Sequence, residues 1–160
     1  MAPGSAVPEL ARQSFEDVYR DARPGLIRLA YLIVGSRAVA EELVQESFLR
    51  LHQRFAEVDN PMGYLRVALV RLCTTANRRR AMEAERLQRA TERGASAEHD
   101  VDETWAVVQR LRPERRVVLV LRYYEDLPHE EIARLLGCPT VTVRTRVRRA
   151  LADLRKELER

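Results

Sequence analysis

The sequence predicts an all-α protein made of two small helical domains joined by a flexible linker. Of its 160 residues, 46% are hydrophobic but only 6% are aromatic. Alanine, leucine, arginine and glutamate favour helices, whereas aromatic residues are enriched in strands. The chain has only 6 glycines and 7 prolines, too few for an all-β protein with many turns. A chain of this length holds one ordinary domain or two very small ones.

Three helices are predicted in the first half of the chain, because apolar residues recur there at spacings of three and four. The breaks between them contain residues that stop helices, namely Gly35-Ser36 and Asp59-Asn60-Pro61. The expected segments are a disordered leader at 1–13, a helix from about Phe15 to Gly35, a helix at 37–55 and a helix from about Met62 to Arg79. A first domain is therefore placed at 14–80.

The composition changes after this domain. Residues 81–103 contain charged residues, alanine, threonine and serine, but few large apolar side chains. Such a stretch can bury little surface, so we predict a linker, with a helical beginning left open. A second domain is placed at 104–160. Its four helices are expected at 104–111, 113–124, 128–136 and 139–158.

Basic residues are concentrated in two stretches. The net charge is only +4, and of the 28 basic residues all but Lys156 are arginine. Residues 60–82 contain five arginines and no acid, and residues 132–152 again contain five arginines and no acid. Two separate acid-free stretches indicate two contacts with a polyanion rather than a uniformly solvated surface.

Several classes of protein are not favoured by the sequence. Cys73 and Cys138 match no metal-binding spacing, so both are expected to be buried or half-buried thiols in a reducing cytosol. No apolar run approaches the ~20 residues of a membrane span, and no signal peptide is recognisable, which indicates a cytoplasmic protein without membrane contact. The histidines are scattered and there is no glycine-rich phosphate loop. We therefore expect no enzyme activity, cofactor or metal.

The strongest local motif is a helix-turn-helix over residues 129–143. Ala133 supplies the small residue that is needed where the two helices touch, and Gly137 tolerates the positive φ of the turn. Pro139 suits the first position of the second helix, and Val143 supplies its apolar anchor. Each feature is common alone, but together at these offsets they predict a helix-turn-helix.

Helical periodicity assigns two faces to the second helix of this motif. The inward stripe is expected to contain Val143, Val147, Ala150, Leu151, Leu154 and Leu158. The opposite face contains Val141, Thr145, Arg148 and Arg149, flanked by Arg144 and Arg146. Arginine and threonine on an outward face near the start of a helix are suited to reading the major groove of DNA. The alternative is a basic face that contacts only solvent.

Two parts of the chain resemble the extracytoplasmic-function sigma factors of bacterial RNA polymerase. Residues 40–51 (AEELVQESFLRL) are similar to the family's conserved-region-2 helix, and residues 111–154 are similar to region 4. Both occur in the family's order with a linker between them, so the resemblance extends over residues 14–158. It implies a non-catalytic factor that binds core polymerase, through its β′ coiled coil and β flap, and directs initiation at promoter DNA.

The resemblance also implies roles for individual residues. In the family, the region-2 helix docks on the β′ coiled coil, the next loop and helix bind the melted −10 strand, and region 4 reads the −35 element. The expected residues are Gln45, Glu46, Leu49 and Gln53 for polymerase, Asn60, Tyr64, Arg71, Thr74 and Arg78 for the −10 strand, and Val141, Arg144, Thr145, Arg148 and Arg149 for the −35 duplex.

The chain departs from the family pattern at three positions. The family commonly has asparagine where this chain has Arg71, aspartate near Thr75, and glycine where this chain has Val141. The valine places methyl groups on the reading face, where they could contact a thymine methyl. Tyr64 suits either a DNA contact or the core.

Two other functions remain as alternatives. A helix-turn-helix regulator would bind duplex DNA as a dimer at a palindrome, without core polymerase. A helical interaction module would bind no DNA, although both basic stretches argue against it. Many members of the sigma family are held by an anti-sigma factor, and the sequence leaves open whether one acts here.

Overall fold

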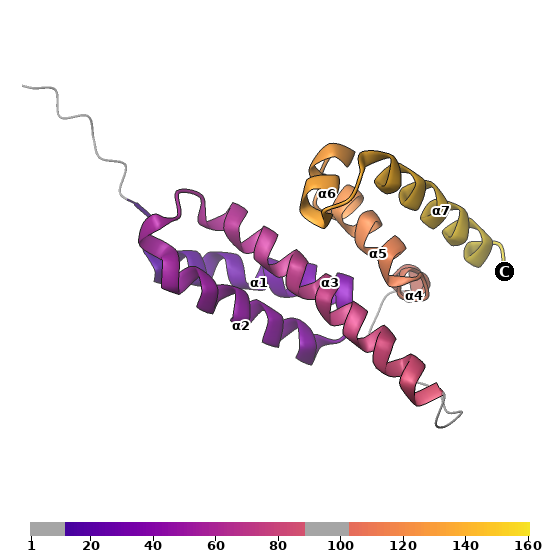
Figure 1. The fold of residues 1–160 in the computed structure, drawn as a ribbon, viewed down its shortest axis with the longest axis horizontal. Coiled ribbons are helices and arrows are strands. Elements are labelled where there is room, and N and C mark those ends of the chain that lie inside the picture. The colour runs from indigo at the N-terminus through magenta and orange to yellow at the C-terminus, as the bar shows by residue number, and fades with distance from the viewer. Residues whose placement is uncertain (1–11, 89–102) are drawn as a thin grey trace, which may run out of the picture.

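The computed structural model describes residues 12–88 and 103–160, and every regular element within them is helical (Figure 1). The prediction of an all-α fold is therefore confirmed for the described residues. The elements are α1 (Phe15–Val34), α2 (Arg37–Arg54), the 3-10 turn η1 (Phe55–Glu57), α3 (Pro61–Gln88), α4 (Glu103–Gln109), α5 (Pro113–Leu119), the π-helical turn η2 (Val120–Tyr124), α6 (His129–Leu136) and α7 (Thr140–Leu158).

The first three helices pack into a bundle around an apolar core. Ser14 caps α1 by accepting a hydrogen bond from the Asp17 N–H (3.2 Å), and Gly35 ends that helix at a φ of 75°. Ser36 then caps α2, so the chain reverses within two residues. The core of the bundle includes Leu29, Ile33, Val44, Phe48, Leu51, Leu65 and Leu69, all buried. Because these side chains recur at helical spacing, each helix buries one stripe.

Helix α3 is longer than the sequence analysis predicted. It continues to Gln88, beyond the expected end at Arg79, and its last turns extend past the bundle (Figure 1). Residues 81–88 are all exposed, so intrinsic helix propensity rather than burial keeps them helical. The expected linker therefore begins inside a helix. Its remaining part, 89–102, and residues 1–11 of the expected leader lie outside the described residues.

The helices from α4 onward form a second, smaller group. Its core includes Leu111, Val118, Leu121, Ile132, Val143 and Val147. The predicted helix at 113–124 is divided into α5 and the π-helical turn η2. Leu158 was predicted to lie inward, but it is 67% exposed, because the last turn of α7 extends beyond the short helices on which it packs. Pro139 is the N-cap of α7 rather than its first helical residue.

The two groups pack against each other. Helix α5 contacts both α1 and α3, and α6 contacts α3. An ion pair between Arg66 of α3 and Glu125, just after η2, joins the groups at 3.0 Å. The two groups therefore share a direct interface in this structure.

Candidate nucleic-acid interface

The turn between α6 and α7 has the geometry of a helix-turn-helix. Gly137 ends α6 with a φ of 65° and donates its N–H to the Ala133 carbonyl. A side chain at position 137 would meet open space, so the positive φ alone favours glycine there. Ala133 is buried where the helices meet, and Val143 is fully buried as the anchor of α7. The predicted roles of Ala133, Gly137 and Val143 are therefore confirmed, whereas Pro139 lies one position earlier than predicted, at the N-cap of α7.

Helix α7 presents a basic face to solvent. Val141 is 67% exposed, and Arg144, Arg148 and Arg149 are exposed on the same side. Thr145 is only half-buried, so it lies at the edge of this face. The opposite stripe of Val143, Val147 and Ala150 is buried against the rest of the second group. Among the described residues, no carboxylate forms an ion pair with Arg148 or Arg149, which leaves both charges available to a polyanion.

One arginine of this face is paired. The Arg144 guanidinium donates to Glu130 of α6 at 3.3 Å, across the helix-turn-helix. The pKa of Glu130 is lowered, first by its own backbone N–H at the start of α6 and then by the charge of Arg144. Glu130 therefore remains charged at neutral pH and restrains the direction of Arg144.

The residues expected at the −10 strand are spread along α3. Asn60 accepts a hydrogen bond from the Gly63 N–H at 3.0 Å and so caps the helix. Tyr64 is half-buried against the core of the first group. Arg78 lies 18 residues after Asn60, which is about 27 Å along a helix. An extended strand, rather than a single base, would be needed to contact both ends of this set.

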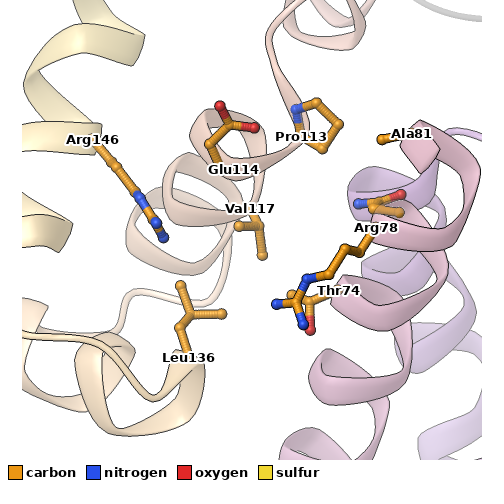
Figure 2. Close-up of a pocket in the computed structure, with 9 residues that line it drawn as sticks. Thr74, Arg78, Ala81, Pro113, Glu114, Val117, Leu136 and Arg146 are labelled. Carbon is orange, nitrogen blue, oxygen red and sulfur yellow. The ribbon is translucent and has the colours of Figure 1, made fainter. Parts of the chain in front are cut away.

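The later residues of the set face two different hollows. Thr74 and Arg78 line a cleft of about 450 Å³ between α3 and the second group, with Arg146 and Leu136 on its other side (Figure 2). Arg71 lines a separate groove between α2 and α3. Thr74 also donates its hydroxyl to the Arg71 carbonyl at 3.0 Å, so it is already engaged within the helix.

The residues expected to contact polymerase lie on the exposed side of α2. Gln45, Glu46 and Leu49 line the groove of about 600 Å³ between α2 and α3, and Leu49 is 52% exposed. Glu46 pairs with Arg50 at 3.0 Å. Gln53 is exposed one turn further on and is not part of the groove. The opposite wall is formed by Arg71, Leu72, Thr75 and Arg79 of α3.

Sequence analysis did not identify two arginines that the structure places between the groups. Arg146 was assigned only to the flank of the reading face, yet it points into the cleft opposite Arg78 (Figure 2). Arg116 was not singled out, and it is buried at 6% exposure. The acid-free stretches were a signal for Arg146, since they contain both arginines of the cleft. No local pattern distinguishes Arg116 from its neighbours.

The described part of the chain has no arrangement for a metal ion and no membrane-spanning helix. Within residues 12–88 and 103–160, no three histidine, cysteine or acidic side chains are arranged to hold a metal ion. No helix there is both long and apolar enough to span a membrane. Cys73 is buried and Cys138 half-buried, and both are free thiols, as predicted.

Comparisons with known proteins identify both groups of helices. Residues 18–82 match the family model for Sigma-70 region 2, and residues 102–154 match the model for Sigma-70, region 4. The RNA polymerase sigma-E factor of Streptomyces coelicolor is 32% identical over 151 residues, which cover 90% of this chain and 85% of the relative. The probable ECF RNA polymerase sigma factor SigI of Mycobacterium tuberculosis is 32% identical over 148 residues, covering 82% of this chain and 51% of the relative.

A solved structure has the same fold. The sigma factor RpoE of Bartonella quintana, solved in complex with the anti-sigma factor NepR, aligns with a TM-score of 0.70 and 20% identity, covering 91% of this chain and 96% of that one. The region-2 match is not expected of an ordinary helix-turn-helix regulator, so that alternative is not favoured. The chain belongs to the sigma-70 family of RNA polymerase sigma factors, in its extracytoplasmic-function group.

Proposed function

We propose that this sigma factor binds core RNA polymerase through the α2–α3 groove, binds the melted −10 strand along α3 and reads the −35 duplex with the outward face of α7. It performs no catalysis of its own: it selects the start site by binding, and polymerase carries out the chemistry. In this role it acts in the cytoplasm, at the chromosome.

The observation that carries this proposal is the division of α7 into two faces. Its buried stripe fixes the helix in the helix-turn-helix, so the exposed valine and arginines project together from a rigid element. Arginine pairing with the edge of a guanine discriminates by ~1–3 kcal/mol, whereas an arginine on a phosphate only positions the protein. Val141 supplies an apolar contact of the kind that recognises a thymine methyl.

The groove beside Leu49 supports the polymerase contact. A half-exposed leucine flanked by Gln45 and Glu46 gives an apolar centre with a polar rim, which is typical of protein interfaces. Arg79 on the opposite wall makes that rim partly basic. A partner helix with acidic and apolar side chains would pair with the basic wall on α3 and pack against Leu49 on α2.

Melting of the −10 element requires no nucleotide hydrolysis. Unpairing costs a few kcal/mol, so the factor favours the open promoter only by binding the separated strand better than the duplex. Arg78 and Arg71, both exposed on α3, can follow phosphates of that strand.

The test is transcription in vitro with sigma-free bacterial core polymerase and a pooled promoter library. We expect transcripts from defined start sites only when the protein is added, and their promoters give the −10 and −35 motifs. Arg148→Ala should lower selectivity at one −35 position by about ten- to a hundredfold. Arg155→Ala, an exposed arginine further along α7, is the matched control and should leave selectivity unchanged.

A second pair of variants tests the groove. Leu49→Asp should abolish binding to core polymerase, whereas Leu87→Asp, at a leucine of similar exposure (58% against 52%), should not. If the protein binds duplex DNA alone but yields no transcripts with polymerase, the proposal fails. A helix-turn-helix regulator that acts without core polymerase would then be the favoured function.

A further inference from the structure

The carboxyl end of α1 receives hydrogen bonds from side chains of both groups. The last carbonyls of a helix have no partner within it, so they need outside donors when they are buried. Within the first group, Asn77 donates to the Ile33 carbonyl (3.2 Å) and Arg80 to the Val34 carbonyl (2.8 Å). From the second group, Arg116 donates to the Ile33 carbonyl (2.9 Å) and Gln109 to the Leu32 carbonyl (3.4 Å).

Arg116 is the buried member of this set. It donates a further hydrogen bond to the Gln109 carbonyl at 3.2 Å, and no carboxylate pairs with it in the described part of the chain. Burial, and secondly the charge of Arg80, lowers the pKa of Arg116 to about 10. The guanidinium is therefore still charged near neutral pH, and the negative end of the α1 dipole compensates it.

Two open hollows flank the contact between the groups. The cleft of about 450 Å³ that contains Arg78 and Arg146 lies between the groups on one side. A second, mostly apolar hollow of about 560 Å³ lies between α1 and the second group and is lined by Leu32, Trp105 and Leu119. Contacts between domains of one chain resemble transient protein interfaces, so relative motion of the two groups is the default expectation. The desolvation cost of Arg116 further reduces the net stability of the contact.

Packing of the two groups against each other leaves the cleft-facing side of α3 less accessible than the outward face of α7. Thr74 and Arg78 open onto the cleft, with Leu136 of α6 and Arg146 of α7 opposite them (Figure 2). A strand lying along this part of α3 would occupy the space between the groups. Val141 and Arg148, by contrast, remain exposed.

We infer that Arg116 holds the free protein in a closed resting state through its hydrogen bond to the Ile33 carbonyl, a contact named the latch below. In this state the second group covers the part of α3 proposed to bind the single strand, until polymerase or DNA separates the groups. The consequence for promoter binding rests on the proposed function, but the latch itself is a property of the free protein.

Energy transfer between two dyes tests the latch in the full-length protein. Ala38→Cys on α2 and Lys156→Cys on α7 place the dyes at exposed positions outside the proposed contacts. Cys138→Ser removes the more accessible native thiol, and the buried Cys73 remains unlabelled. We expect high transfer in the free protein and a lower value in Arg116→Ala. Loss of a hydrogen bond from a charged donor should shift the open-to-closed ratio about ten- to a hundredfold.

Asn77→Ala is the matched control. It removes a hydrogen bond to the same Ile33 carbonyl, but from within the first group, so transfer should remain high even if stability falls. Gln109→Ala is the second variant, used in case Arg116→Ala fails to fold by circular dichroism. It removes a neutral donor from the second group and should open the protein about two- to tenfold.

These experiments distinguish failure of the latch from failure of the proposed function. Unchanged transfer in both Arg116→Ala and Gln109→Ala, or a wild-type protein that is already as open as Arg116→Ala, overturns the latch. If Arg116→Ala opens, it should also bind a single-stranded oligonucleotide of the −10 motif more tightly than wild type does. If it opens but no form of the protein supports initiation, the latch stands and the proposed function fails.

Discussion

The two basic stretches of the sequence lie in different surroundings. On α7, Arg144, Arg148 and Arg149 project into solvent from one side of the helix. On α3, Arg78 opens onto the cleft between the two groups, and Thr74 beside it is half-buried. The difference has a simple cause: α7 packs through one stripe, whereas α3 contacts α1 and α2 and also α5 and α6. Arg78 is itself exposed, so the difference lies in its surroundings: the second group stands across the cleft from it.

This comparison suggests an order of events. In the proposed closed state, a duplex would reach the exposed face of α7, whereas a single strand would lie along the cleft-facing part of α3 only after the groups separate. The first group also contains the two longest helices, α1 and α3, and the aromatic cluster of Phe15, Tyr19 and Phe48.

The largest effect is expected in the core of the first group. Phe48→Ala should lower the free energy of unfolding by about 3–5 kcal/mol, because it leaves a cavity at a fully buried position. Leu49→Ala, at the half-exposed neighbour, should change it far less. Urea unfolding followed by circular dichroism measures both. Trp105 lies beside Tyr31 of α1, so its fluorescence follows the contact between the groups. A fluorescence transition at lower urea than the circular dichroism transition would show that the groups separate before the first group unfolds.

The two thiols should differ in reactivity by about a hundredfold. Burial raises the pKa of Cys73 to about 12, so at pH 8 little thiolate forms and little of it is accessible. A disulfide reagent should therefore modify Cys138 first and Cys73 only on unfolding. The thiol of the unfolded chain ionises at a lower pH, so the contribution of Cys73 to stability is present below about 9 and is lost as the pH rises towards 12. Rapid modification of both thiols in the native protein would contradict the buried position.

A smaller effect is expected for the single-strand face. Arg78→Ala should weaken binding of a −10 oligonucleotide by about three- to tenfold and reduce its salt dependence by roughly one ion. Arg86→Ala, exposed on the projecting end of α3, is the control. The loss should be clearest in the Arg116→Ala background, where the cleft is open. If Arg78→Ala weakened duplex binding by the closed protein to the same extent, α3 and α7 would not bind different forms of DNA as proposed.

The smallest effect concerns the pair across the helix-turn-helix. Glu130→Gln frees Arg144, and selectivity at the base that faces it should fall by no more than about fivefold, because the pair is exposed. Non-specific duplex affinity should rise, since a carboxylate beside DNA is removed. Promoter-library selection measures both, with Glu159→Gln at the far end of α7 as control. A rise in selectivity would show that Glu130 holds Arg144 away from the bases.

Local signals in the sequence determined most helix ends. A serine at position 14, and glycines at positions 35 and 137, set their boundaries through hydrogen bonds and φ values within a few residues. Helical periodicity likewise predicted the buried stripe of Val143, Val147 and Ala150. It was wrong at Leu158, because periodicity gives the direction of a side chain but not whether a neighbour lies there. The helix was expected to end near Arg79, with a helical beginning of the linker left open, and α3 continues to Gln88 although residues 81–88 bury nothing, because propensity alone extends it.

Only the tertiary structure decided the roles of the arginines. Arg115 and Arg116 are adjacent and chemically identical, yet Arg115 forms a half-buried ion pair with Asp153 of α7 while Arg116 is buried against α1. The carbonyl that accepts its hydrogen bond lies 83 residues away in the chain. A cap depends on the few residues around it and can be predicted from them. The burial of a charge depends on which distant dipole compensates it, and that is fixed only when the two groups of helices pack together.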